Sequence, residues 1–94
     1  MSYEESIKRS FSINALLGKS PRGVESREHI IIKLIAFLTD KKEYDNVRRS
    51  AAKVLGNWKA KEAIKILTGI ASDEAEQNDN LKKAAMTAIQ EIQS

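Results

Sequence analysis

A stretch of eleven residues recurs in this chain, and this internal repeat restricts the folds that the chain can adopt. Residues 45–55 read DNVRRSAAKVL, and 34 positions later residues 79–89 read DNLKKAAMTAI. Matching positions hold aspartate, asparagine, an aliphatic residue, two cations and small side chains. The preceding segments also correspond, since residues 38–40 (LTD) and 71–73 (ASD) lie 33 positions apart. Self-similarity at such a period is typical of helical repeats, in which each unit buries its apolar face against the next.

A fainter copy of the same unit lies near the N-terminus. Residues 7–10 (IKRS) resemble residues 47–50 (VRRS) at a distance of 40 positions. The likeness ends quickly, because Phe11 and Ser12 stand where the second copy has two alanines. The predicted unit is therefore a helix, a polar turn with an aspartate, and a second helix that opens with an apolar residue and two cations. Its first copy is degenerate.

Apolar residues recur at helical spacing in five segments, with few turn-forming residues between them. One proline and four glycines in 94 residues are too few for an all-β chain. Ser26 and Asp45 are suited to cap the second and third helices, because short polar side chains accept from free N–H groups at helix starts. The spacing predicts an all-α chain with helices over residues 3–17, 26–39, 45–57, 60–72 and 79–92.

The length of the chain, 94 residues, predicts a single domain over residues 1–94. Alanine pairs at 51–52 and 84–85 allow two helices to approach closely, as stacked hairpins require. One hairpin cannot bury both of its faces, so neighbouring hairpins must share a core. The domain divides into a degenerate first helix (3–18), a first full hairpin (26–57) and a second full hairpin (60–92).

The composition argues against several kinds of chemistry. The chain has no cysteine, which excludes disulfides, thiolate metal sites and cysteine nucleophiles. His29 is the only histidine, so neither a zinc site nor a histidine-based catalytic triad is supported. The acidic residues between Asp73 and Glu76 lack the glycine and the ligand spacing of a calcium loop. We therefore expect no metal, no cofactor and no catalytic residue.

Neither a secretory signal nor a membrane span is evident in the sequence. Residues 1–6 (MSYEES) are polar and acidic rather than basic and then apolar. The longest apolar-rich stretch, residues 30–38, is interrupted by Lys33 and is much shorter than the roughly 20 residues that cross a bilayer. We expect a cytoplasmic protein that does not enter membranes.

The second copy of the unit resembles a known family of helical repeats. Residues 47–56 (VRRSAAKVLG), followed by residues 62–67 and Asp73, are similar to the short bacterial HEAT repeats first recognised in phycobilisome lyases. The resemblance covers residues 26–92 well and residues 3–18 only weakly. It implies a bacterial protein that folds as a right-handed α-α superhelix of about five helices, or two to two and a half hairpins.

The sequence also departs from the family pattern. The turns at residues 41–44 and 74–78 are longer than the compact family turn and lack its usual proline. Tetratricopeptide repeats share the 34-residue period, but their Trp-x-x-Leu-Gly-x-x-Tyr pattern is missing here, as is the ankyrin signature. The HEAT-like interpretation therefore remains the favoured one.

The resemblance implies a structural role for the first cation of each repeated pair. In HEAT-like folds an early basic residue of the second helix helps to form a ladder of hydrogen bonds between repeats. This role falls on Arg48 and Lys82. Their long side chains can reach carbonyls or carboxylates at a neighbouring turn, such as Asp45 or Asp79.

The same resemblance places the second helix of each hairpin on a concave, partner-binding face. We expect Arg49, Lys53, Lys83 and Thr87 to lie there, offset from the buried positions. Trp58 follows the turn between the hairpins, and it either caps the edge of the core or serves as a partner-binding aromatic.

These residues predict a non-catalytic scaffold that binds a protein partner, and the net charge of +3 favours an acidic one. Two alternatives stay open. Recurring cation pairs at residues 8–9, 48–49 and 82–83 could form a phosphate track for nucleic acid. The resemblance also allows an accessory subunit of a bilin lyase. We expect a monomer or a weak homodimer formed through an end hairpin.

Overall fold

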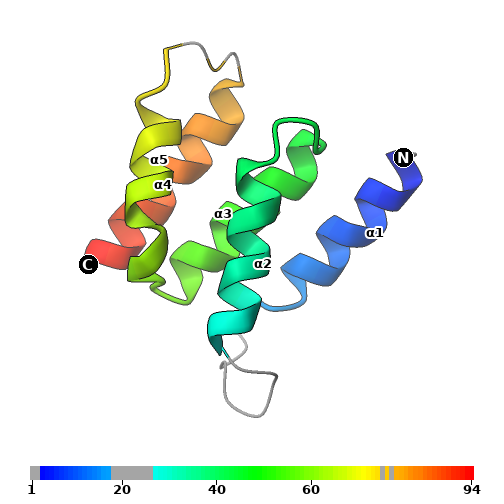
Figure 1. The fold of residues 1–94 in the computed structure, drawn as a ribbon, viewed down its shortest axis with the longest axis horizontal. Helices are drawn as coiled ribbons and strands as arrows, with labels where there is room; N and C mark the ends of the chain where they lie inside the picture. The colour runs from blue at the N-terminus through cyan, green and yellow to red at the C-terminus, as the bar shows by residue number, and fades with distance from the viewer. Residues whose placement is uncertain (1–2, 18–26, 75, 77) are drawn as a thin grey trace.

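The computed structural model describes residues 3–17, 27–74, 76 and 78–94, and these residues are helical throughout apart from turns (Figure 1). Within this described part no strand occurs. The predictions of an all-α chain and of five helices are confirmed. The elements are α1 (Tyr3–Asn14), α2 (Arg27–Thr39), α3 (Asp45–Asn57), the single 3₁₀ turn η1 (Lys61–Ala63), α4 (Ile64–Ala71) and α5 (Asp79–Gln93).

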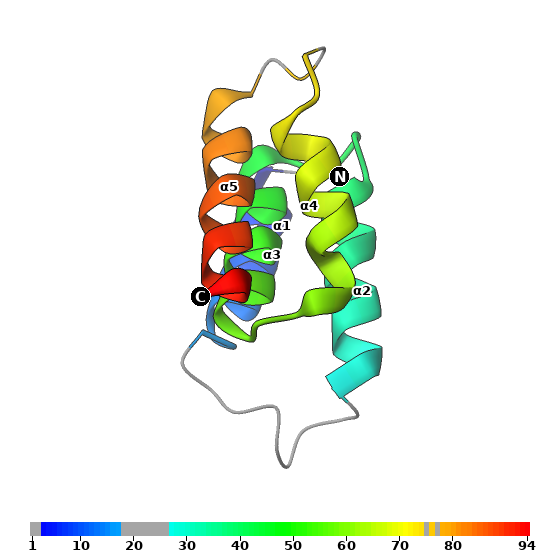
Figure 2. The ribbon, with the colours of Figure 1, turned by 90° about the vertical axis from the view of Figure 1, so that its left-hand side faces the viewer.

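The helices lie in two layers. Figure 2 shows α1, α3 and α5 side by side on one side of the molecule, which we call the inner layer, and α2 and α4 on the other, the outer layer. Helix α3 is the centre of this arrangement, because it packs against α1, α2 and α5, while α4 packs against α5. The molecule is accordingly a slab that measures 38 × 34 × 18 Å along its principal axes.

The core lies between the two layers and is almost entirely aliphatic. Helix α3 is buried on three sides, and only Lys53 and Asn57 of its residues are well exposed. Its neighbours contribute mostly leucines, isoleucines and alanines, as expected from a chain with only 5 % aromatic residues. The residues that are completely buried and large are Leu38, Val47, Val54, Leu55, Leu67 and Leu81.

Helices α3 and α5 approach each other closely at a glycine. A Cβ atom added to Gly56 would lie 2.7 Å from the Cα atom of Ala88, which is far inside van der Waals contact. Only glycine allows the two backbones this distance. Gly56 is therefore required for the close packing of α3 against α5, and not for a turn that ends the helix.

Helix α3 ends one residue later, at Asn57, with a Schellman motif. Lys59 adopts a left-handed backbone conformation (φ 53°), and its N–H donates to the Gly56 carbonyl. The Ala60 N–H donates to the Leu55 carbonyl, and both of these residues are fully buried. This pattern satisfies the last carbonyls of the helix and adds an apolar contact across its end. The chain then turns into η1 and α4.

The structure corrects one expectation about helix caps. Asp45 is the first residue of α3 rather than its cap, because Tyr44 holds the cap position and makes no side-chain capping bond. At the start of α5 the cap is Asn78, whose side-chain oxygen accepts from the Leu81 N–H. Ser26, the expected cap of α2, lies outside the described residues.

We predict opposite effects when two helical glycines are replaced by alanine. Gly56→Ala should lower the free energy of unfolding by about 1–3 kcal/mol, because α3 and α5 must move apart. Gly69→Ala should raise it by up to about 1 kcal/mol, because a Cβ there meets nothing within 4 Å and alanine favours the helix. Urea denaturation of both variants measures the difference. Equal effects of the two substitutions would contradict the close packing at Gly56.

Candidate interaction surfaces

Arg48 connects the outer layer to the turn before α5. Its Nε–H donates to the carbonyl of Leu38, near the C-terminal end of α2, at 3.0 Å. Its Nη1 lies 3.1 Å from a carboxylate oxygen of Glu76. Only 9 % of Arg48 is exposed. Burial makes both contacts structurally important, since an arginine is rarely buried without partners.

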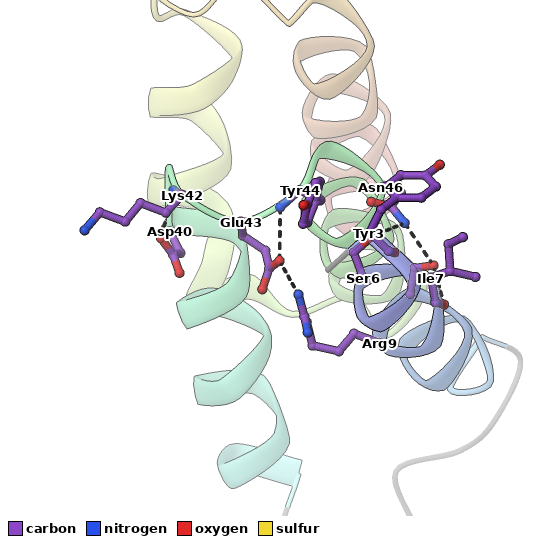
Figure 3. Close-up of polar contacts among 10 residues, drawn as sticks. Tyr3, Ser6, Ile7, Arg9, Asp40, Lys42, Glu43, Tyr44 and Asn46 are labelled. Carbon is purple, nitrogen blue, oxygen red and sulfur yellow. Dashed lines mark hydrogen bonds and ion pairs between the residues drawn. The ribbon is translucent and has the colours of Figure 1, made fainter. Parts of the chain in front are cut away.

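Arg9 makes the corresponding contact one hairpin earlier. Figure 3 shows its guanidinium from α1 pointing at Glu43, with Nη2 2.7 Å from a carboxylate oxygen. The same oxygen accepts from the Tyr44 N–H at 3.0 Å. Glu43 is thus held beside the first turn of α3, as Glu76 is held beside Arg48. Arg9 therefore has the role of Arg48. Alignment of the cation pairs 8–9 and 48–49 would instead have matched Arg9 with Arg49.

Two further polar contacts link successive inner helices at the same end. The Asn78 side-chain amide donates to a carboxylate oxygen of Asp45. The Asn46 side-chain amide lies 3.5 Å from the hydroxyl of Ser6 and 3.4 Å from that of Ser10 in α1 (Figure 3). Each contact joins a residue at the start of one inner helix to the inner helix before it.

Of the four residues expected to form the hydrogen-bond ladder, Arg48 and Asp45 make polar contacts with other elements. Arg48 reaches a carbonyl and a carboxylate, but the carboxylate belongs to Glu76 rather than Asp79. Asp45 takes part through Asn78. Lys82 and Asp79 make no side-chain hydrogen bond or ion pair among the described residues. The physical reason is that no described helix or turn lies beyond α5 for Lys82 to reach.

The candidate partner-binding cations lie on the exposed side of the inner layer. Lys53, Lys83 and Thr87 are exposed, and none of them has a side-chain hydrogen bond or ion pair within the described residues. Arg49 is only partly exposed, and its guanidinium lies 2.7 Å from the carboxylate of Asp45, one helical turn earlier. The structure thus brings Lys53, Lys83 and Thr87 to the surface and partly engages Arg49.

Trp58 does not belong to this surface. Its side chain lies in the core with 8 % exposed, and its indole N–H donates to the Leu16 carbonyl at 3.2 Å. This contact ties the end of α3 to the turn that follows α1. Of the two roles expected for Trp58, the core-edge role fits this position, since the ring is covered within the described structure.

Sequence reasoning missed the residues that receive the arginines. Glu43 and Glu76 lie 33 positions apart, and each follows an aspartate by three residues, at Asp40 and Asp73. This spacing was a usable signal. The Arg27–Glu62 pair, with distances of 2.7 and 3.3 Å between guanidinium and carboxylate, left no such pattern because its two residues do not recur.

Acidic side chains also gather around Arg48 in an open hollow of about 580 Å³. Glu76 binds Arg48, Glu43 binds Arg9, and Asp45 binds Arg49 and Asn78. Within residues 3–17, 27–74, 76 and 78–94, no group of three histidine, aspartate or glutamate side chains is arranged to hold a metal ion. In the same ranges no helix is both long and apolar enough to cross a bilayer. Three of the four carboxylates that line the hollow, those of Glu43, Asp45 and Glu76, are thus bound by arginines of the chain, and the fourth belongs to Asp79.

Comparison of the chain with models of known families, with curated proteins and with solved structures found no match. The HEAT-like assignment therefore stays a prediction from the sequence. Function must be inferred from the contacts, exposure and charges of the residues described above.

Replacing Arg48 by methionine should destabilise the protein far more than the same change at Lys82. The loss should be about 2 kcal/mol, because the substitution leaves the Leu38 carbonyl and the Glu76 carboxylate without their buried partner. Lys82→Met, at the equivalent repeat position, should change the free energy of unfolding by less than about 0.5 kcal/mol. Chemical denaturation tests the pair. Similar losses in both variants would show that Arg48 does not couple the layers.

The Arg27–Glu62 pair predicts a small dependence of stability on pH. Hydrogen bonds donated by Arg27 hold the pKa of Glu62 below its usual 4.5. The pair therefore stabilises the fold above pH 4.5, and this contribution is lost as the pH falls through the lowered pKa. The Glu62 side chain is 46 % exposed, so the contribution is below about 1 kcal/mol.

Arg27→Gln should raise the pKa of Glu62 towards 4.5, as followed by NMR titration of its carboxyl carbon. Lys61→Gln, which removes a cation next to Glu62 in sequence but none that binds it, is the control. An unchanged pKa in Arg27→Gln would show that the ion pair does not form in solution.

Proposed function

We propose that this chain is a non-catalytic, HEAT-like helical scaffold that binds an acidic segment of a partner protein across the exposed sides of α3 and α5. The observation that supports this proposal most directly is that two lysines on these helices are exposed and have no ion-pair partner among the described residues. Lys53 and Lys83 are exposed and have no carboxylate partner among the described residues, whereas Arg9, Arg27 and Arg48 are all held by glutamates. Cations without internal partners are available to an external one.

The packing of α3 on α5 gives these side chains a shared surface. Because the backbones nearly touch at Gly56 and Ala88, the exposed stripes of the two helices lie next to each other. Lys53 and Thr87 occupy equivalent positions in the 34-residue repeat, as do Arg49 and Lys83. A segment crossing both helices would therefore meet cations on each of them.

The energetics favour an extended contact over a single one. Exposed ion pairs contribute only about 0.2–1 kcal/mol each, so useful affinity requires several pairs together with hydrogen bonds. Thr87 offers a hydroxyl beside Lys83. Arg49 is held by Asp45 at the surface, with both side chains more than one third exposed, and a partner carboxylate can share its guanidinium.

Reversing the charge of the exposed lysines should remove partner binding without affecting the fold. We expect Lys53→Glu/Lys83→Glu to lose captured partner by at least about tenfold, because two favourable charge contacts become repulsive. Lys61→Glu/Lys65→Glu has the same change in net charge, but on exposed residues of η1 and α4, and it should keep the partner. Quantitative affinity capture from native lysate compares the two variants with the original chain.

The circular dichroism spectra of both variants should match that of the original chain. Equal retention of the same proteins by both variants would contradict the proposed surface. A labelled DNA duplex provides the discriminating second measurement. Binding of that duplex that is abolished by Lys53→Glu/Lys83→Glu and weakens steeply with salt would identify the surface as a phosphate track instead.

A further inference from the structure

A second surface lies at the opposite edge of the slab, between α1 and α2. Here the molecule has an open hollow of about 520 Å³. In Figure 1, α1 lies at the edge of the molecule, and no helix of the described residues stands over it as α2 and α4 stand over α3 and α5. The hollow is lined by Arg9, Lys33, Ala36, Phe37, Asp40 and Glu43.

A corresponding hollow occurs one hairpin later, where α4 faces α2. Its volume is about 230 Å³, less than half that of the first. It is lined by Thr39, Lys41, Arg48, Ile66, Gly69, Ile70, Asp73 and Glu76.

The two hollows are built from the same positions of the repeat. Five residues that line the first, at 33, 36, 37, 40 and 43, recur 33 positions later at 66, 69, 70, 73 and 76 in the second. The sixth, Arg9, binds Glu43 as Arg48 binds Glu76. Every residue of the first hollow therefore has a counterpart in the second.

The second hollow differs from the first because two of its lining residues come from α2 and the turn after it. Thr39 and Lys41 come from α2 and the turn that follows it, and they have no counterpart in the first hollow. The C-terminal end of α2 thus lies against Arg48 and borders the hollow on α4, and we call this arrangement the filled seat. The matching seat, formed by α2 and Arg9, holds no helix of the described chain. The difference between 230 and 520 Å³ agrees with this absence.

The filled seat shows what kind of helix fits the empty one. Helix α2 places its C-terminal Leu38 carbonyl on the Nε of Arg48. An occupant of the empty seat, running parallel to α2, would place its own last carbonyls over Arg9. The negative end of the helix dipole favours this arrangement beside a cation.

The charges of the empty seat specify the occupant further. Beyond the end of α2, Lys41 lines the filled seat together with Asp73 and Glu76. Asp40 and Glu43 hold the same places in the empty seat, so the occupant should continue into a basic residue. Ala36 and Phe37 offer it a small apolar floor. Lys33 replaces Ile66, which favours an acidic side chain midway along the occupant.

We propose that the hollow between α1 and α2 is the seat of one further outer-layer helix supplied by a partner protein. The partner helix is amphipathic and parallel to α2, with an acidic residue facing Lys33 and a basic residue after its C-terminal end. This surface is separate from the α3 and α5 surface proposed above, and either can exist without the other.

A peptide with the sequence of residues 27–42 is a direct probe of the empty seat, because the C-terminal end of this segment borders the equivalent hollow within the chain. Fluorescein-labelled peptide should bind the full chain in an anisotropy titration. Ala36→Trp should weaken this binding by at least about tenfold, since an exposed alanine at the floor becomes a ring that fills the seat. Thr68→Trp, at an exposed position of α4 outside both hollows, should change it by less than about twofold.

A charge exchange tests the orientation of the helix. Asp40→Lys should weaken the peptide, and a peptide with glutamate at both positions 41 and 42 should recover affinity for that variant alone. Recovery supports the parallel arrangement, and its absence overturns it. Circular dichroism of the Ala36→Trp, Thr68→Trp and Asp40→Lys chains must first match the original.

Three other results would overturn the proposal. The peptide could fail to bind, or it could bind equally to Ala36→Trp, which would place it elsewhere, such as in the seat of α2 itself. Light scattering could also show a concentration-dependent dimer that Ala36→Trp abolishes. That dimer would identify a second copy of this chain, rather than a partner helix, as the occupant.

Discussion

The close packing of α3 against its two inner neighbours is the constraint on which the rest of the structure depends. With Ala51, Ala52 and Gly56 among its buried residues, α3 lets α5 approach until Gly56 meets Ala88, while its larger apolar side chains are completely buried in the core. A bulkier α3 would push the inner helices apart and open the thin core. The small and the large buried residues of α3 therefore both serve the same packing. It explains how a chain with few aromatics buries a continuous core.

Apolar packing alone does not fix the positions of the turns before α3 and α5. The arginine contacts fix them. Arg9 holds Glu43 before α3, and Arg48 holds Glu76 before α5. Each contact fixes a turn that is longer than a tight helix connection. Because Arg48 also binds the end of α2, the same side chain joins the outer layer to the inner one. Arg48 thus links the position of α2 to the position of the turn before α5.

The five helices and their approximate bounds could be predicted because apolar spacing and scarce turn residues are local properties. The side-chain contacts could not, because they depend on which elements meet in space. The sequence suggested Asp45 as a helix cap. Its carboxylate instead binds Arg49 of the same helix and Asn78 at the start of α5. The sequence leaves two roles open for Trp58, and its contact with the turn after α1 is not a local property that the sequence could show. Repetition predicted the kind of residue at each position, but not whether a neighbour lies beside it.

Whether a neighbour is present is also what distinguishes the two hollows. A repeated unit carries the same seat in every copy, and whether the seat is filled depends on the neighbour alone. At the edge beside α1 the positions of the filled seat are kept in Ala36, Phe37 and Asp40, while Lys33 takes the place of Ile66. An exposed isoleucine there would face water whenever the seat is empty, whereas a lysine is solvated when the seat is empty and can pair when it is full. The substitution is what a surface requires if it must be stable alone and still accept a helix.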